Sequence, residues 1–241
     1  MAARTSITPT PADSRLTRDR LVGAAAIAFA GLYVAENVIF AATGALGYDA
    51  PIASVLDYYA ANPVPLGIIS GLVAAYLPLF LVFVTGLHGI VQRHGGTGVD
   101  WSRLASGAGA AFAVVFVLFN VLQIGLVLSA GVLPEATPAF QIVWQAHAAA
   151  FALALPMLGT TVIGAALATH ASGMTPAWQR VLGVVSGSLL LAAGVGSLPV
   201  ADGSPLIFVG LLGFAAALVW FVVTGIRLVC GTALAPVGGR S

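Results

Sequence analysis

The chain has 241 residues, of which 59 % are hydrophobic and only 7 % are charged, namely 9 Lys or Arg and 8 Asp or Glu. Soluble domains carry about 25 % charged residues, and a soluble domain of this length has too little interior to bury so much apolar surface. Disorder is excluded because the chain has more than enough apolar surface to drive burial. A single cysteine excludes a disulfide framework. This is the composition of a polytopic membrane protein.

Residues 1–20 are rich in Thr, Ser, Pro, Arg and Asp, which predicts a disordered cytoplasmic tail. Six apolar segments follow, each long enough for the roughly 20 helical residues that cross a bilayer. They are 21–45, 65–92, 104–131, 139–169, 179–200 and 205–229, and 230–241 form a second cytoplasmic tail. The segments are apolar on every face, whereas barrel strands alternate. The predicted fold class is therefore all-α, a six-helix transmembrane bundle.

The longest outer connection, 46–64, contains a short amphipathic pattern. Ile52, Val55, Leu56 and Tyr59 follow the i, i+3, i+4, i+7 spacing of one helix face. This pattern predicts a helix over 51–61 that lies at the outer membrane surface as a lid over the bundle.

The basic residues give the predicted orientation. All nine are arginines, at positions 4, 15, 18, 20, 93, 103, 180, 227 and 240. With both termini inside, every arginine falls on the cytoplasmic side, whereas the outer loops hold Asp49, Asp57, Glu135 and Asp202. This asymmetry follows the positive-inside rule, so we expect both termini in the cytoplasm and a multi-pass protein of the bacterial cytoplasmic membrane.

Short matches recur at an offset near 77 residues. Trp101 and Trp178 each open an apolar segment, and Leu77-Pro78 matches Leu155-Pro156. These matches predict a parallel repeat of helical hairpins.

The residues at 57–62 (DYYAAN) and 172–178 (SGMTPAW), together with the order of the six segments, resemble a group of uncharacterised bacterial six-helix membrane proteins that is known as a domain of unknown function. The resemblance covers most of residues 21–229. It implies the six-helix fold and no particular activity.

Polar side chains inside the predicted segments gather at one level. At a rise of 1.5 Å per residue, the deeper ones lie about 12–16 Å from the outer ends of their segments. Helical spacing places each set on one stripe that is able to face a common interior. We predict a ligand-binding pocket in the outer half of the bundle, formed by Tyr33, Glu36, Asn37, Tyr76, Asn120, Gln123, Trp144, Gln145 and His147.

Glu36 carries the functional hypothesis, because a carboxylate in hydrocarbon costs several kcal/mol unless it is paired or neutralised. Its expected partners are His147, Asn120 and Gln123. The leading interpretation is binding or transport of a small lipophilic or weakly polar solute, with Glu36 handling a proton.

Two alternatives stay open. One is an intramembrane enzyme that acts on a lipid or isoprenoid with Glu36 and His147 as an acid–base pair. The other is a polar cluster that joins helices by hydrogen bonds and has no ligand. A cavity open sideways to lipid favours the enzyme, and one that opens outward under the 46–64 lid favours transport.

No cofactor is expected. Glu36 and His147 supply only two metal ligands, fewer than a metal site needs. His88 and His170 lie at the inner ends of two segments, and two interpretations are open for them: axial ligands of a haem, or imidazoles exposed to solvent at the membrane interface. No basic patch predicts a nucleic-acid partner. The expected partners are membrane lipids and a small-molecule ligand, and the oligomeric state stays open.

Overall fold

The computed structural model describes the backbone of residues 11–231 and the side chains of residues 17–231. All regular structure in this range is helical. The helices are α1 (Pro11–Ala42), α2 (Ile52–Ala61), α3 (Pro63–Arg93), α4 (Val99–Ala130), α5 (Pro138–Ala171), α6 (Ala177–Val195), α7 (Ser197–Ala201) and α8 (Ile207–Val229). Six of these are long and apolar enough to cross a membrane, all except α2 and α7. The predicted six-helix fold is confirmed.

The first helix begins earlier than predicted. Residues 1–10 of the expected tail lie outside the described residues, but 11–20 are helical rather than disordered. A tertiary contact that composition does not reveal fixes this part of the helix at Asp19, whose buried carboxylate accepts a hydrogen bond from Arg93 at the end of α3, at 2.5 Å. Of the predicted second tail, residues 232–241 lie outside the described residues.

The fifth apolar segment also differs from its predicted bounds of 179–200. Helix α6 ends at Val195, and the five-residue helix α7 follows after Gly196. Pro199 lacks a backbone N–H and its ring obstructs the preceding turn, so a straight continuation of α6 is disfavoured at this point. The chain then turns into α8.

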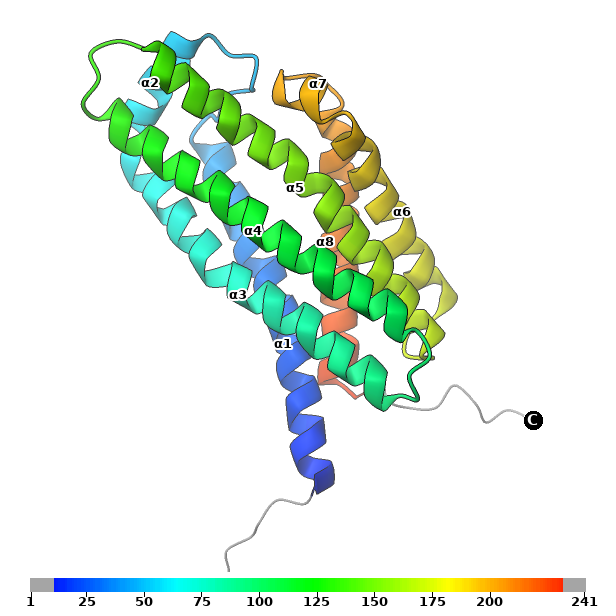
Figure 1. The fold of residues 1–241 in the computed structure, drawn as a ribbon. Coiled ribbons are helices and arrows are strands. Elements are labelled where there is room, and N and C mark those ends of the chain that lie inside the picture. Colours follow the sequence, from blue (N-terminus) through cyan, green and yellow to red (C-terminus); the bar gives the residue numbers. More distant parts are fainter. Residues whose placement is uncertain (1–10, 232–241) are drawn as a thin grey trace, which may run out of the picture.

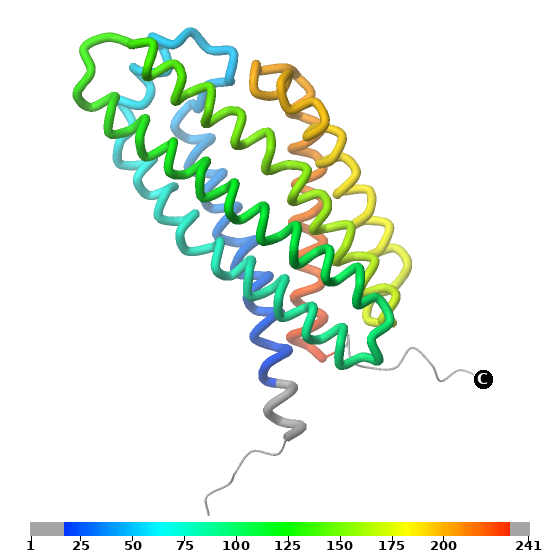
Figure 2. The backbone as a smooth tube through the Cα atoms, viewed as in Figure 1, coloured from blue at the N-terminus to red at the C-terminus, as the bar shows by residue number. Residues whose placement is uncertain are grey.

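The six long helices form a closed ring (Figure 1). Each packs against the next in the order α1, α3, α4, α5, α6 and α8, and α8 returns to pack against α1. Helix α2, helix α7 and the α4–α5 connection lie at one end, which we call the α2 end. The start of α1 and the α3–α4 and α5–α6 connections lie at the opposite end (Figure 2), which we call the termini end.

The ring is drawn together by glycines at helix contacts. A Cβ atom added to Gly225 of α8 would lie 2.7 Å from the Gly23 carbonyl oxygen of α1, and one added to Gly159 of α5 would lie 2.6 Å from the Gly187 carbonyl oxygen of α6. Small residues let helix backbones approach closely, and this packing is what holds helices together in lipid.

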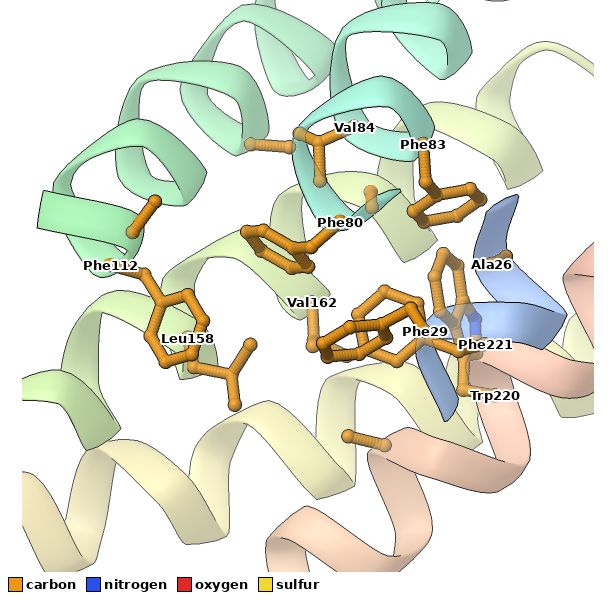
Figure 3. Close-up of a cluster of buried hydrophobic side chains, with 14 of the residues drawn as sticks. Ala26, Phe29, Phe80, Phe83, Val84, Phe112, Leu158, Val162, Trp220 and Phe221 are labelled. Carbon is orange, nitrogen blue, oxygen red and sulfur yellow. The ribbon is translucent and has the colours of Figure 1, made fainter. Parts of the chain in front are cut away.

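Aromatic side chains fill the middle of the ring (Figure 3). Phe29, Phe80, Phe112 and Phe221 come from four different helices and are at most 2 % exposed. The Phe29 ring centroid lies 5.2 Å from those of Phe80 and Phe221, and the Phe80 and Phe112 centroids are 5.1 Å apart. The ring therefore has a solid centre.

Helix α2 covers part of the α2 end. It buries Val55, Leu56 and Tyr59, three of the four residues on its predicted apolar face. These pack with the outer turns of α3, α4 and α5, including Ile69 and Trp144. The amphipathic pattern thus produces a helix that packs on the bundle.

Charges separate between the two ends of the ring. The six arginines among residues 17–231 lie at the ends of helices that face the termini end, at positions 18, 20, 93, 103, 180 and 227. The α2 end carries Asp57 in α2 and Asp49, Glu135 and Asp202 in its connections. The orientation of this molecule in the membrane stays a prediction.

The orientation is testable by cysteine labelling from outside the cell. In a Cys230→Ser background, we expect an impermeant maleimide to label Asp57→Cys and Glu135→Cys at the α2 end and to leave Thr97→Cys unlabelled, because only the arginine-poor end should face outward. All three native side chains are exposed. Labelling of Thr97→Cys alone would reverse the orientation.

The glycine contacts predict that a Gly→Ala substitution lowers stability only where the glycine lies at a close helix contact. Gly159→Ala should lower the melting temperature in detergent, because overpacking a close helix contact costs about 1–3 kcal/mol. Gly107→Ala on the exposed side of α4 meets nothing within 4 Å and should be neutral or slightly stabilising. Equal melting temperatures for the two variants would contradict the packing described here.

Candidate functional site

A cavity of about 480 Å³ occupies the α2 end of the ring. This is within the range of small-molecule sites, about 300–1,000 Å³. The lining is drawn from five of the six long helices (all except α6), from α2, and from the α1–α2 and α7–α8 connections. Its residues are Tyr33, Glu36, Asn37, Phe40, Leu46, Gly47, Tyr48, Asp49, Val55, Tyr58, Tyr59, Ile69, Phe116, Phe119, Gln123, Trp144, His147, Phe151, Gly203, Ile207, Phe208 and Leu211.

Six of the nine predicted pocket residues line this cavity, namely Tyr33, Glu36, Asn37, Gln123, Trp144 and His147. Tyr76 and Asn120 lie outside the lining, although both form hydrogen bonds that involve α3. Gln145 does not fit the prediction, because it is exposed and absent from the lining. Trp144 and His147 are three residues apart and share the buried face of α5, from which Gln145 points away.

The hydrogen-bond partner of Glu36 is not one of the residues expected from the sequence. The Tyr76 hydroxyl of α3 donates a hydrogen bond to Glu36 Oε2 at 2.8 Å. Tyr76 is fully buried and Glu36 is 8 % exposed. Within the described residues Glu36 forms no ion pair and no hydrogen bond to His147. The carboxyl group is thus positioned by one neutral donor from the neighbouring helix.

The predicted amides join helices. Gln123 Nε2 donates to the Ser70 hydroxyl at 3.4 Å, and Asn120 Nδ2 donates to the Ser70 carbonyl oxygen at the same distance. These weak bonds connect α4 to α3. Asn120 therefore serves helix packing, and Gln123 both packs and lines the cavity.

His147 is enclosed by aromatic rings. Its imidazole stacks on Phe119 at 4.1 Å and on Trp144 at 5.4 Å between centroids, and Tyr48 meets it edge-on at 6.0 Å. Both ring nitrogens are buried without a hydrogen-bond partner, a state that costs about 1–3 kcal/mol per unsatisfied group. His147 is thus part of the aromatic wall, and its nitrogens lack the partner that the sequence interpretation assigned to them.

The α1–α2 connection supplies residues that the sequence analysis missed. The Tyr48 ring contacts Trp144 at 5.2 Å and Phe151 at 5.9 Å, so it closes the cavity from above α5. Burial raises the pKa of the Tyr48 phenol, and burial likewise raises that of Tyr59 in α2. Both phenols stay neutral at physiological pH. The sequence signal for Tyr48 was an aromatic residue in a short connection between two helices.

The rim of the cavity includes a close contact between two connections. Gly203, after α7, has φ +84°, a conformation that L side chains rarely adopt, and a Cβ atom there would lie 2.6 Å from Asp49 Cβ. The connections α1–α2 and α7–α8 therefore touch at the edge of the cavity, and only glycine permits this approach.

The exposed lining residues lie in two places. Gly47 and Asp49 are in the α1–α2 connection, and Phe40 of α1 and Phe208 of α8 stand on neighbouring helices. Phe40 is in the last turn of α1 and Phe208 is in the first turn of α8. The cavity therefore reaches the surface at two rims, both at the α2 end: one at the α1–α2 connection and one beside the terminal turns of α1 and α8.

The cavity ends before the middle of the ring. A second void of about 20 Å³ shares Tyr33, Phe116 and Phe151 with it and reaches Leu158. Beyond this void the phenylalanines of the aromatic centre are packed against one another. The path from the α2 end is therefore closed toward the termini end.

The two histidines considered for haem lie elsewhere. His88 makes hydrogen bonds with the Ser102 hydroxyl at 2.7 Å and with Gln92 at 3.0 Å, one through each ring nitrogen. His170 Nδ1 contacts the Thr175 carbonyl oxygen at 3.0 Å. The described residues contain no group of three or more side chains suited to hold a metal ion.

Comparison with protein-family models, with curated proteins and with solved structures finds no match for this chain. Its function is therefore argued from the geometry of the cavity.

The hydrogen bond between Tyr76 and Glu36 gives a prediction about stability. Tyr76→Phe should lower the free energy of unfolding by about 1–3 kcal/mol, because a buried acceptor loses its donor. In a Glu36→Leu background the same change should cost much less, since the acceptor is gone. Thermal unfolding of the four proteins in detergent measures both effects. An equal cost in the two backgrounds would show that the bond adds no stability.

Proposed function

We propose that this integral membrane protein binds a small lipophilic or weakly polar solute in the cavity at the α2 end and moves it across the membrane, with Glu36 taking up and releasing a proton. The observation that carries the proposal is the position of Glu36. Its buried carboxyl group, which has no ion-pair partner among the described residues, lies in the wall of a cavity of about 480 Å³.

The shape of the cavity supports this function. Both rims lie at the α2 end, the rim beside α1 and α8 carries the exposed apolar side chains of Phe40 and Phe208, and the floor is closed by aromatic residues. A solute that partitions into lipid therefore has a route into the site past these two phenylalanines. The predicted orientation places the α2 end outside, in the cytoplasmic membrane of a bacterium.

We also propose that the chain is related to the uncharacterised bacterial six-helix membrane proteins that its sequence resembles. The six long apolar helices support this relation.

An intramembrane enzyme is the second candidate. The rim beside α1 and α8 favours it, because its exposed apolar side chains suit the entry of a lipid or isoprenoid tail. Its acid–base pair would be Glu36 and His147, which line one cavity. The unpartnered nitrogens of His147 weigh against a formed pair, so transport is the function that the site supports best.

The proposal is tested with Glu36→Gln in proteoliposomes that enclose a pH-sensitive dye. For the wild type we expect at least one of benzyl alcohol, benzylamine and benzoate to move protons faster than in protein-free liposomes. Glu36→Gln should abolish this movement, because the amide does not titrate. It should also melt at the same or a higher temperature, since a neutral amide is cheaper to bury than a carboxylate.

Glu135→Gln is the matched control. Glu135 is an exposed carboxylate in the α4–α5 connection and does not line the cavity, so its proton movement should equal that of the wild type. Wild-type proton movement in Glu36→Gln, or none with any of the three solutes in the wild type, would overturn the proposal. Chemical conversion of an added lipid would favour the enzyme instead.

A further inference from the structure

The charges around the cavity have one sign. Glu36 lies in the wall, Asp49 lies at the rim, and none of the lining residues is an arginine or a lysine. The α2 end adds Asp57 in α2 and Glu135 and Asp202 in its connections, whereas the arginines among residues 17–231 lie at the termini end. The negative electrostatic potential of these carboxylates attracts cations to the cavity and repels anions.

Glu36 has no counter-ion among the described residues. It accepts a hydrogen bond from the neutral Tyr76 hydroxyl, and no cationic side chain in this part of the chain pairs with it. Burying a carboxylate without neutralisation is costly. One bound proton satisfies this requirement, and so does one bound cation. The two are therefore alternative occupants of the same position.

The walls suit a cation with apolar substituents. Ten of the 22 lining residues are aromatic, and Tyr48, Phe119 and Trp144 present rings around one side of the cavity. The face of an aromatic ring attracts a cation, most strongly when both are removed from water, and cages of this kind recognise quaternary ammonium groups.

The lining is poorer in charged oxygen ligands than a small metal cation requires. Calcium and magnesium need about six or more oxygen ligands, mostly carboxylates, carbonyls and water. The cavity offers two carboxylates, Glu36 in the wall and Asp49 at the rim, and its other polar side chains are amides, tyrosines and His147. An organic cation has no hydration shell of that strength to replace. It also buries its own apolar surface against the rings.

We propose that the solute is a lipophilic organic monocation, held with its positive charge beside Glu36 and its apolar groups against the aromatic walls. This inference rests on the proposed function, since it names the class of solute for that site. Binding is an exchange: as one cation enters, the Glu36 carboxyl releases one proton to water at the α2 end. The net charge of the occupied cavity then equals that of the protonated empty one.

The exchange sets the direction of the pH dependence. The other titratable groups around Glu36 are Tyr33 of α1, Tyr76 of α3, His147 of α5, Tyr58 and Tyr59 of α2, and Tyr48 and Asp49 of the α1–α2 connection, whereas α4 and α8 add none to the lining. Because protons and cations compete for Glu36, cation binding should weaken as pH falls. Binding of a neutral solute should not follow this trend.

The test uses two ligands of nearly the same shape. Phenyltrimethylammonium carries one positive charge, and tert-butylbenzene replaces its nitrogen by carbon and is neutral. For the purified protein in detergent, we expect the cation to bind at least about tenfold more tightly than the neutral compound, which corresponds to about 1.4 kcal/mol. Glu36→Gln should reduce cation binding to the level of the neutral compound. In weakly buffered solution, cation binding should release protons from the wild type and none from Glu36→Gln.

A second pair of variants keeps the inference testable if Glu36→Gln folds poorly. Trp144→Leu removes an aromatic face from the wall and should weaken binding of the cation more than that of tert-butylbenzene. Trp178→Leu changes an exposed tryptophan at the start of α6, away from the cavity, and should change neither.

The outcomes separate the solute class from the proposed function. Equal binding of the two compounds by the wild type, or unchanged cation binding in Glu36→Gln, overturns the cation inference. Either result leaves the proposed function standing if the liposome experiment still shows proton movement that depends on Glu36. Loss of that proton movement, in contrast, removes the proposed function itself.

Discussion

A ring of six helices encloses more space than its backbones fill, and this geometric constraint shapes the whole molecule. In the middle of the ring, phenylalanines from several helices fill the space and bring the helices into mutual contact. Glycines at contacts such as Gly159–Gly187 then let the ring draw tight around that centre. Toward the α2 end the inward side chains do not meet, and the cavity is the space that remains. The core and the cavity therefore have the same origin, namely how far the inward side chains fill the ring.

The cost of burying polar groups in this cavity is only partly compensated. Tyr76 satisfies Glu36 through a hydrogen bond, and aromatic rings cover His147 without satisfying its nitrogens. A site that holds a hydrogen-bonded carboxyl and an unsatisfied imidazole in one apolar space is costly to build. Such costs are characteristic of functional sites in membranes.

Much of the fold followed from the sequence, because span length and apolarity are strong local signals. The six long helices and the amphipathic helix α2 were predicted within a few residues at most of their ends. Two bounds were wrong: α1 begins before the apolar segment, in the region where Asp19 pairs with Arg93, and α6 ends at Val195, four residues before Pro199. Depth along each span also brought six pocket residues together. Depth alone does not give rotation about the helix axis, so Gln145 was placed inward and Tyr76 was not paired with Glu36. Tyr48 was missed because loop positions carry no periodic signal.

The anchoring of α1 has a mechanical consequence. Near the termini end it is fixed twice, by the ion pair of Asp19 with Arg93 and by the close contact of Gly23 with Gly225. Glu36 lies thirteen residues beyond Gly23, about 20 Å along the helix at a rise of 1.5 Å per residue. Over that lever arm, a tilt of about 5° displaces the carboxyl group by about 2 Å, which is enough to break a hydrogen bond such as that with Tyr76. The same tilt would alter the gap beside α8. Rocking one helix about its fixed end is thus sufficient to couple access to the cavity with the environment of its acidic group.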